Sequence, residues 1–328
     1  MSHLLELDDL YVEFHTRDGV ARVLNGVSCH VDAGETLALL GESGSGKSVT
    51  AQAIMGILDM PPAMIRSGRI LYDGRDLLAL PAEERRALRG AGVAMVFQDA
   101  LSALNPVFPV GWQISEALRI RHRLSKTEAR TRAIALMQRV KIPAAETRVD
   151  DYPHQFSGGM RQRVMIAMAL ALDPKVLIAD EPTTALDVTV QAQIMDLLME
   201  LKNERGMALI LITHDLGVVA QVADRIAVMY AGRIVEQADV HALYRRPAHP
   251  YTRALLESMP RQHRDDQPLK VISGLPPNLT RIPPGCPFNP RCTVALPLCR
   301  EQLPAILELP GGRLSACHRA QEVLDGIA

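Results

Sequence analysis

The sequence predicts an α/β fold with a mostly parallel core sheet that helices cover on both faces. Three observations lead to this prediction. Short apolar segments alternate with longer helical ones, a glycine-rich loop joins one apolar segment to a helix, and two later apolar segments end in acidic or polar residues. Parallel strands need long crossovers between them, so such alternation is typical of parallel sheets. With 328 residues and 48% apolar composition, the chain can build one large or two modest domains.

The expected elements follow one another in order along the chain. The first 60 residues read as strands that lead into the glycine-rich loop and its helix, and a hairpin with Asp73-Gly74 at its turn spans residues 67–76. Ser125 and Glu128 form a capping box at the start of a later helix. Further strands are expected at 93–97, 176–179 and 208–212, and an amphipathic helix at 188–202 that ends near Gly206. After about residue 245, frequent prolines predict an irregular, loop-rich tail.

Charge and composition exclude several classes of protein. The formal net charge is −1, which gives no support to nucleic-acid binding. The longest apolar run, Val164 to Leu172, is about half the length that a bilayer span needs. No basic stretch followed by an apolar one opens the chain, so no secretory signal is expected. We therefore expect a soluble, cytosolic protein, and any membrane role must come through a partner.

Residues 41–48 read Gly-Glu-Ser-Gly-Ser-Gly-Lys-Ser, a complete phosphate-binding loop between a strand and a helix. The glycines let successive backbone N–H groups point at a phosphate, and the helix adds its positive N-terminal end. Lys47 is expected to contact the β- and γ-phosphates of a nucleotide, and Ser48 to bind Mg²⁺; the loop alone leaves kinases, GTPases and motor proteins open. A glycine-rich turn that binds nothing is the structural alternative. The expected nucleotide-binding residues here are Gly41, Ser43, Gly44, Ser45, Gly46, Lys47, Ser48 and Val49.

Two further motifs narrow the chemistry. A buried strand ends in Asp180-Glu181, so two carboxylates lie at the strand's C-terminal end, where ligands of such sheets bind. Asp180 is expected to bind Mg²⁺, and Glu181 to polarise the attacking water. Ser157, Gly158 and Gly159 open a helix, in which Ser157 is a good N-cap and the glycines leave N–H groups exposed to a phosphate. An ordinary capped helix is the alternative for this second motif.

The order of these motifs resembles that of ATP-binding cassette ATPases over residues 1 to about 235. Phe156-Ser-Gly-Gly-Met160 is similar to the family's Leu-Ser-Gly-Gly-Gln signature, with Phe in place of Leu and Met in place of Gln. The resemblance implies a P-loop NTPase fold of the cassette type, with a small antiparallel β part and a helical subdomain at about residues 99–170. It also implies an ATP-binding domain over residues 1–240 and a C-terminal extension over residues 241–328.

The same resemblance assigns roles to further residues. Gln98 looks like the loop glutamine that contacts both Mg²⁺ and the membrane partner, and His214 looks like the histidine that senses the γ-phosphate. Ala185-Leu186-Asp187 resembles the loop whose aspartate contacts the opposite subunit. Phe14 is the first choice for a ring that stacks on adenine, and Tyr11 is the second, although either can equally be a core residue.

In this family, two ATPase subunits pack head to tail, and each ATP lies between the phosphate loop of one subunit and the signature of the other. The resemblance therefore implies that Ser157, Gly158 and Gly159 act on ATP bound to a partner subunit. ATP then favours the closed dimer, and hydrolysis loosens it.

Five cysteines occur, and four of them lie after residue 285 with 5, 6 and 17 residues between them: Cys286, Cys292, Cys299 and Cys317. In a reducing compartment this clustering favours a metal over disulfides. Four thiolates can hold tetrahedral Zn²⁺ or an iron–sulfur cluster, and scattered free thiols are the third reading. Residues 246–256 resemble the segment after the cassette in dipeptide and oligopeptide importers, and that resemblance favours a [4Fe–4S] cluster over zinc. Cys29 is expected to be a buried apolar side chain.

Together, the resemblances imply the ATPase subunit of a bacterial dipeptide or oligopeptide importer, bound peripherally at the cytoplasmic face of the inner membrane. Its expected partners are two membrane permeases, a second, paralogous ATPase subunit in a heterodimer and, indirectly, an extracytoplasmic peptide-binding protein. No nucleic-acid partner is expected. Two alternatives stay open: the same machinery importing nickel, glutathione or another small solute, and a soluble cassette ATPase acting on nucleic acid or ribosomes. We expect the core of the ATPase domain to lie apart from the tail, so that changes in the tail leave ATP binding intact.

Overall fold

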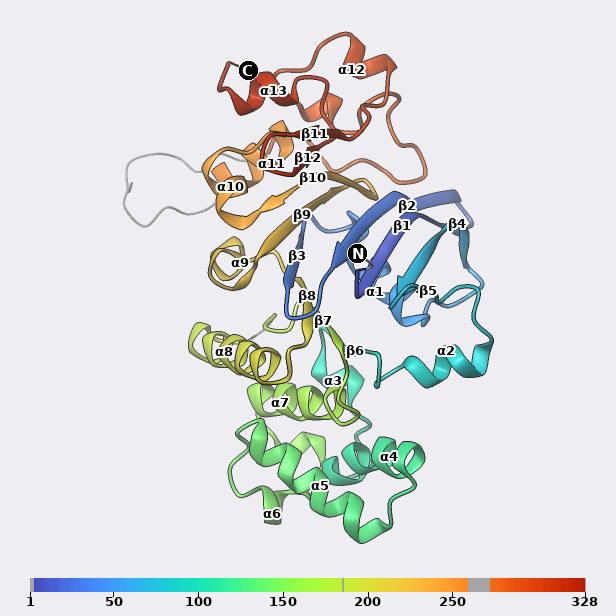
Figure 1. Cartoon of the computed structure of the whole chain (residues 1–328), viewed down its shortest axis with the longest axis vertical. Coiled ribbons are helices and arrows are strands. Elements are labelled where there is room, and N and C mark those ends of the chain that lie inside the picture. The colour runs from blue at the N-terminus through green and yellow to red at the C-terminus, as the bar shows by residue number, and fades with distance from the viewer. Residues whose placement is uncertain (1–2, 185, 259–271, 328) are drawn as a thin grey trace. The chain divides into compact units, whose positions relative to one another are not determined.

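The computed structural model describes residues 3–184, 186–258 and 272–327, which belong to two compact units (Figure 1). The first unit contains the described residues up to Asp32, the segment Thr36–Ala79 and the chain from Thr213 onward. The second unit contains Ala33–Glu35 and Leu80–Ile212. The phosphate loop and the cysteine tail therefore belong to the first unit, and the acidic pair and the signature segment to the second. The domain boundary expected near residue 240 falls inside the first unit and stays a prediction.

One sheet of the first unit is antiparallel, with its strands in the order β2-β1-β4-β5. These strands are β1 (Leu5–Thr16), β2 (Gly19–Val31), β4 (Ala63–Tyr72) and β5 (Arg75–Asp76). The predicted hairpin is confirmed, because β4 and β5 pair across Asp73 and Gly74, whose φ values are 49° and 73°. Positive φ at both central residues is what a two-residue turn of this hand requires. The strand before the turn begins at Ala63 rather than at residue 67.

The remaining strands of the first unit are β3 (Thr36–Leu40), β9 (Arg225–Tyr230), β10 (Arg233–Asp239), β11 (Leu307–Leu309) and β12 (Arg313–Ser315). β3 pairs with β9 in parallel, whereas β9 with β10, β10 with β12, and β12 with β11 are antiparallel. The sheet here is therefore mixed: β3 and β9 have the parallel pairing that was predicted for the core, and antiparallel strands that were not predicted extend it. Ala231 and Gly232 cause the difference, because their φ values of 48° and 76° fold β10 back on β9 instead of leading into a crossover helix.

The helices of the first unit are α1 (Lys47–Met55), α9 (Leu216–Val222), α10 (Val240–Arg245), α11 (Pro250–Glu257), α12 (Leu298–Glu301) and α13 (Ala320–Leu324), with a 3₁₀ turn, η2 (Asn289–Arg291). Tyr251 of α11 and Phe288 of the tail are buried in the same core as β3 and β9. They lie beside Tyr230, the last residue of β9. The tail thus packs onto the strand that pairs with the one leading into the phosphate loop.

Three parallel strands form the centre of the second unit: β6 (Val93–Val96), β7 (Val176–Asp180) and β8 (Ala208–Ile212). All their residues are buried, as in a parallel sheet that is covered on both faces. The three predicted strands are confirmed to within one residue. The helices of this unit are α2 (Ala82–Leu88), α3 (Ala100–Ala103), α4 (Val110–His122), α5 (Lys126–Arg139), α6 (Ala145–Arg148), α7 (Gly158–Ala169) and α8 (Val188–Arg205), with a 3₁₀ turn, η1 (Pro153–Gln155). Figure 1 shows α4, α5, α6 and α7 gathered side by side.

Helix ends follow the signals in the sequence. α8 ends at Gly206, whose φ of 60° is the left-handed C-cap that was expected there. At the start of α5, Ser125 Oγ accepts a hydrogen bond from the N–H of Glu128, and Glu128 Oε2 accepts one from the N–H of Ser125. The capping box is therefore confirmed. In the part of the chain that the structure describes, no helix is both long and apolar enough to span a bilayer.

Removing this cap should destabilise the second unit. We expect Ser125→Ala to lower the free energy of unfolding by about 1 kcal/mol, because the N–H of Glu128 loses its acceptor. Urea denaturation followed by circular dichroism measures the change. Lys126→Ala is the control, since Lys126 is exposed at the next position and should cost less than about 0.5 kcal/mol. Equal losses in the two variants would contradict a role for the cap.

Candidate functional site

The phosphate loop joins β3 to α1, and two of its glycines allow a close approach that other residues would prevent. Gly41 has a φ of 152°, and a Cβ there would lie 2.3 Å from the carbonyl oxygen of Met229 in β9. Gly46 has a φ of 109°, and a Cβ there would lie 2.8 Å from Leu24 Cδ2 in β2. The loop therefore rests directly on two strands of the first unit, and any side chain at these positions would push it away.

Polar groups point into this loop. Lys47 Nζ donates hydrogen bonds to the carbonyl oxygens of Gly41 (2.7 Å) and Glu42 (3.0 Å), so its charge is held within the loop. Ser45 Oγ is buried and has no hydrogen-bond partner among the described residues. A buried polar atom of this kind is costly unless a ligand or water satisfies it. The loop therefore fits a bound phosphate. Ser43, Gly44 and Ser48 are exposed beside it, and Val49 is half-buried in the first turn of α1.

In the second unit, the ends of two neighbouring parallel strands bring Gln98 and Glu181 together. Gln98 Nε2 donates to Glu181 Oε2 at 3.0 Å, and Thr184 Oγ1 donates to the same oxygen at 2.9 Å. Asp180, the last residue of β7, is 5% exposed. Glu181 has a φ of 47°, a left-handed conformation that is uncommon for a residue with a side chain and is concentrated at functional sites. The geometry orients the Glu181 carboxylate; its role in hydrolysis stays a prediction.

The signature segment opens α7. Ser157 Oγ accepts a hydrogen bond from the N–H of Met160, so Ser157 is the N-cap, and Gly158 and Gly159 form the first turn. A Cβ at Gly159 would lie 2.6 Å from Val190 Cγ1 of α8, so the glycine lets α7 begin close against α8. Phe156, the residue that replaces Leu, is buried beneath the guanidinium of Arg148, which lies 4.4 Å from the ring centre. It fills an apolar position, as the leucine of the family motif would.

Asp187 also caps a helix. Its Oδ1 accepts a hydrogen bond from the N–H of Val190 at 3.0 Å, at the start of α8. The residue is exposed, which suits the predicted contact with another subunit, but its place in the fold is already explained by the cap. Ala185 of the same predicted motif lies outside the described residues.

The other predicted nucleotide contacts lie in the first unit. His214 is exposed and stands just before Asp215, which caps α9. Phe14 of β1 is half-buried between Ala21 of β2 and Ala63 of β4, and these small neighbours leave part of its ring accessible. Tyr11 instead packs over a glycine, because its hydroxyl oxygen would lie 2.9 Å from a Cβ at Gly26. Phe14 therefore stays the better candidate for stacking on adenine.

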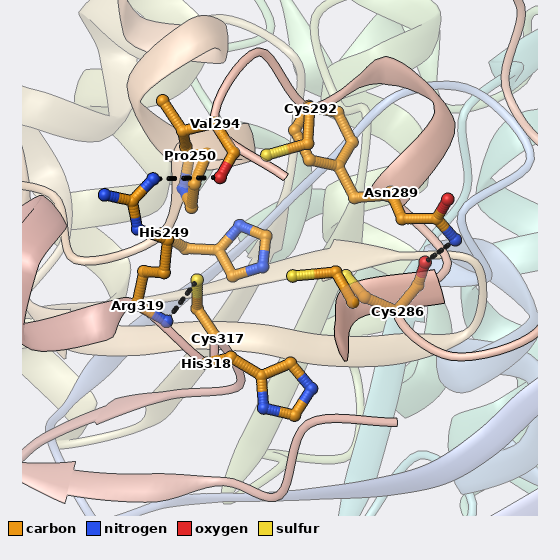
Figure 2. Close-up of a pocket in the computed structure, with 11 residues that line it drawn as sticks. His249, Pro250, Cys286, Asn289, Cys292, Val294, Cys317, His318 and Arg319 are labelled. Carbon is orange, nitrogen blue, oxygen red and sulfur yellow. Dashed lines mark hydrogen bonds between the residues drawn. The ribbon is translucent and has the colours of Figure 1, made fainter. Parts of the chain in front are cut away.

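The four tail cysteines, none of them in a disulfide, line one small cavity in the first unit (Figure 2). This four-cysteine cavity has a volume of about 10 Å³, and its walls include His249 and Phe288. Backbone N–H groups already point at two of the sulfurs: that of Arg319 at Cys317 Sγ and that of Leu296 at Cys299 Sγ, each at 3.4 Å. Such donors stabilise a thiolate. The donor set therefore fits a thiolate-bound metal group, and a group larger than one ion requires the walls to move apart.

Three of the cysteines that line this cavity, and His249, are uncharged at neutral pH when no metal is bound. Burial raises the pKa of Cys286 to about 11 and that of Cys317 to about 12, and it also raises the pKa of Cys292. These side chains are thiols at neutral pH until a metal displaces their protons. Burial lowers the pKa of His249 to about 3, so the imidazole ring that lines this cavity is uncharged at neutral pH. No three of the four sulfurs lie within 4.8 Å of one another, whereas tetrahedral zinc needs separations of about 3.8 Å.

A second group of metal-ligand residue types, which sequence reasoning missed, consists of His3, His30 and Asp32 in the first unit. His3 Nδ1 is hydrogen bonded to Asp32 Oδ1 at 2.8 Å, and His30 Nε2 lies 3.0 Å from Arg225 Nη1. The two imidazole rings stack with centroids 3.6 Å apart, so their in-plane lone pairs run parallel rather than converge on one ion. The group is explained by stacking and hydrogen bonds.

Sequence reasoning also missed the residues that fasten the tail to the phosphate loop. The carboxylate of Glu42, the second residue of the loop, pairs with Arg291, and its backbone N–H donates to Tyr251 Oη at 2.9 Å. The sequence gives only a weak indication of this contact. Glu42 is an acidic residue in a loop whose other residues are glycine, serine and one lysine.

Three features together define a P-loop ATPase. They are a phosphate loop that precedes a helix, an acidic pair at the end of a parallel strand, and a helix that begins with a serine N-cap and two glycines. The ABC transporter family model matches residues 24–184, and the model of the oligopeptide/dipeptide transporter C-terminal region matches residues 235–299. The chain therefore belongs to the ABC transporter family, as an ATPase with that C-terminal region.

Individual relatives agree with this assignment. The chain is 50% identical to the oligopeptide transport ATP-binding protein OppD of Bacillus subtilis, over 94% of this chain and 87% of that protein. It is 49% identical to the dipeptide transport ATP-binding protein DppD of Escherichia coli, over 96% of each. Among solved structures, a dimeric ATP-binding cassette in a post-hydrolysis state with ADP and Pi is 28% identical, with a TM-score of 0.64 over 72% of this chain and 98% of that one.

Lys47 gives the most direct test of the nucleotide site. We expect Lys47→Ala to weaken MgATP binding by at least a hundredfold, about 2.7 kcal/mol, because the phosphates lose their cation while the fold is kept. Equilibrium titration measures the affinity, and circular dichroism checks the fold. The control is Lys175→Ala, an exposed lysine of the second unit that should leave the affinity unchanged. Equal affinities for wild type and Lys47→Ala would refute the phosphate-loop assignment.

Proposed function

We propose that this chain is the ATPase subunit of a peptide importer, and that its ATP hydrolysis drives the uptake of dipeptides or oligopeptides through membrane permeases. The observation that carries the proposal is the presence, in one chain, of a phosphate loop that fits ATP and the C-terminal region of oligopeptide and dipeptide transporters. Relatives at about 50% identity are transport ATP-binding proteins for these two cargoes. If the chain were an ATPase acting on nucleic acid or ribosomes, its match to the transporter C-terminal region over residues 235–299 would have no explanation.

Nucleotide binding follows from the loop geometry. The N–H groups of Gly44 and Gly46 and the N-terminal end of α1 are proposed to hold the phosphates, with the buried Ser45 Oγ as a further donor and Lys47 adding charge at the β- and γ-phosphates. Phe14 is proposed to stack on adenine. Mg²⁺, when bound, neutralises developing charge on the phosphates, and Ser48, Gln98 and Asp180 are its proposed ligands.

Hydrolysis is assigned to Glu181. Gln98 and Thr184 both donate to one oxygen of its carboxylate, which fixes the orientation of the group. In that orientation the Glu181 carboxylate is proposed to accept a proton from the water that attacks the γ-phosphate. His214 is proposed to sense the γ-phosphate from the end of the strand that precedes it.

A second ATPase subunit completes the proposed site. Gly158 and Gly159, which start the twelve-residue helix α7, carry no side chains of their own that could block a phosphate. We propose that Ser157 and these glycines bind the ATP held by a paralogous partner, and that Asp187 contacts that partner. The domain organisation proposed for the chain is an ATP-binding domain over residues 1–240 and an importer-type extension over residues 241–328.

Permeases are the proposed membrane partners. The second unit exposes large apolar side chains close together in the sequence: Leu101, Val107, Phe108 and Trp112. Phe108 and Trp112 stack on each other with ring centroids 4.2 Å apart, although each ring is more than a third exposed. Exposed aromatic groups of this kind mark protein–protein contacts. We propose that a permease covers them at the cytoplasmic face of the inner membrane, and that an extracytoplasmic peptide-binding protein feeds the permeases.

For the four-cysteine cavity we propose a [4Fe–4S] cluster, with structural zinc as the alternative. Four thiol groups on one cavity supply the ligand set of such a cluster. Because the described cavity has a volume of only about 10 Å³, binding of the cluster requires its walls to move apart. The N–H groups that point at Cys299 and Cys317 support a site for thiolates.

Glu181→Gln tests the ATPase and the transport function together. The change keeps the shape of the side chain and removes the group that takes the proton, so hydrolysis should slow by about a thousandfold, or about 4 kcal/mol of barrier. The variant should still bind ATP and should accumulate as an ATP-bound dimer in size-exclusion chromatography. Hydrolysis and peptide uptake are measured in vesicles that contain the permeases, with a peptide-binding protein and a defined tripeptide outside.

The control for this experiment is Glu204→Gln, an exposed residue of α8 that should leave both rates unchanged. Full hydrolysis by Glu181→Gln would show that another group positions the water. Wild-type hydrolysis that drives no peptide uptake in these vesicles would count against the cargo assignment.

The cysteine site is tested by its metal content. We expect anaerobically purified protein to be brown and to carry about four irons per chain, the content of one [4Fe–4S] cluster. Cys299→Ser should lose this iron and make residues 285–318 sensitive to protease, because the metal contributes much of the local folding energy. Cys29→Ala, at a buried position in β2, should keep the iron. Colourless protein with one zinc per chain would refute the cluster and support structural zinc.

A further inference from the structure

An ion pair joins the described part of the tail to the phosphate loop. Arg291 Nη1 lies 2.5 Å from Glu42 Oε2, and Arg291 Nη2 lies 2.9 Å from Glu42 Oε1, so the guanidinium grips the carboxylate with two parallel hydrogen bonds. The Arg291 side chain is 5% exposed and that of Glu42 is 24% exposed. The pair is bidentate and largely shielded from water. Its geometry therefore fixes the orientation of the two side chains, in addition to the attraction between their charges.

Glu42 passes this constraint on to the residues that bind phosphate. Its N–H is held by the hydroxyl oxygen of Tyr251 at 2.9 Å, so both its side chain and its backbone are tied to residues after position 250. Its carbonyl oxygen accepts hydrogen bonds from the N–H of Ser45 (3.2 Å) and from Lys47 Nζ (3.0 Å). A shift of Glu42 therefore shifts the acceptor that helps to hold Lys47.

Arg291 belongs to the cysteine segment, and its side chain also donates hydrogen bonds to the carbonyl of Ser273 (3.0 Å) and to Tyr230 Oη (3.3 Å). It stands directly before Cys292 and five residues after Cys286, in a segment with little slack. The carbonyl of Cys286 accepts hydrogen bonds from both the N–H and the side-chain amide of Asn289, at 2.9 and 2.8 Å. The N–H of Cys286 donates to the carbonyl of Cys299 at 2.8 Å. Any change in spacing between these cysteines must move the short turn that carries Arg291.

Charge gives the pair a second consequence. Glu42 is an anion within the loop that has to receive the polyphosphate of a nucleotide. Arg291 neutralises it, so removal of the arginine would leave an unpaired carboxylate beside the phosphates, where like charges repel. Removal of the charges of both Glu42 and Arg291 would relieve this repulsion, but it would not restore the ion pair that holds the loop in place.

We propose that Arg291 is a positioning residue for nucleotide binding, which holds the phosphate loop through Glu42 and makes nucleotide affinity depend on the state of the four-cysteine cavity. The inference rests on the proposed ATP site. The cavity and the loop are then two coupled sites in one chain: a cavity whose four cysteines are in place keeps Arg291 on Glu42, and a disrupted cavity loosens this pair and weakens nucleotide binding.

The experiment measures the affinity of the full chain, purified with its metal, for MgADP, a probe that avoids hydrolysis. We expect Arg291→Ala to raise the dissociation constant at least tenfold. Arg291→Lys keeps the positive charge but cannot form the bidentate hydrogen bonds, so it should raise the dissociation constant less. Glu42→Gln should have a smaller effect than Arg291→Ala, and adding it to Arg291→Ala should restore part of the lost affinity. The matched control is Arg300→Ala, an exposed arginine next to Cys299, which should stay within twofold of wild type.

The coupling to the cavity is tested with Cys299→Ser. This change should raise the dissociation constant in the wild-type background and add nothing in the Arg291→Ala background. Equal additional losses in both backgrounds would overturn the coupling. An Arg291→Ala chain that folds and binds MgADP as wild type does would overturn the positioning role. If Arg291→Ala does not fold, Arg291→Lys and Glu42→Gln decide: additive effects of these two in the double variant would overturn the pair as a unit.

Failure of this inference is distinguishable from failure of the proposed function. Wild-type protein that binds MgADP no better than Lys47→Ala would show that the loop is not a nucleotide site at all. Thermal unfolding midpoints are recorded for every variant. A purely structural role for Arg291 would lower the midpoint and leave the dissociation constant of the folded protein unchanged, and that result would overturn the proposal.

Discussion

The first unit depends on the packing of three aromatic rings against one another. Tyr230 at the end of β9, Tyr251 of α11 and Phe288 of the cysteine segment lie with ring centroids 4.6 to 5.3 Å apart. Aromatic residues make up only 4% of the chain, so three in mutual contact concentrate much of its aromatic packing at one place. Each ring comes from a different segment. Their contact brings the Tyr251 hydroxyl and Arg291 to the phosphate loop, and the loop would lose both if the rings separated.

Features specified by a few neighbouring residues could be predicted from the sequence. Asp73-Gly74 gives a turn, Ser125 with Glu128 a capped helix start and Gly206 a helix end, because each acts on backbone groups within a few residues of itself. The same holds for the phosphate loop, whose order of glycines and lysine specifies its own conformation. The contact of Gln98 with Glu181 is less local, and only the resemblance to a known family pointed to a shared site for the two residues.

The rest could not be predicted, because it depends on partners far apart in the chain. Glu42 and Arg291 are 249 positions apart and Glu42 and Tyr251 are 209, and no periodic pattern relates residues at such separations. The antiparallel pairing of β9 with β10 was not predicted for a more local reason. The turn between them is Ala231-Gly232, and this pair of residues indicates a turn less strongly than Asp-Gly does. The packing of Tyr251 and Phe288 into the same core as β3 and β9 was likewise not predicted, because the composition change near residue 245 gives no information about packing.

The order of synthesis gives the pair of Glu42 and Arg291 a further consequence. The ribosome makes the phosphate loop early and its arginine partner 249 residues later. At about 5–20 residues per second, the unfinished chain carries an unneutralised Glu42 for roughly 10 to 50 s. During that interval the loop lacks the cation that offsets its own negative charge, and it should bind ATP poorly. The acidic residue of the phosphate loop therefore gains its basic partner only when nearly the whole polypeptide has been made.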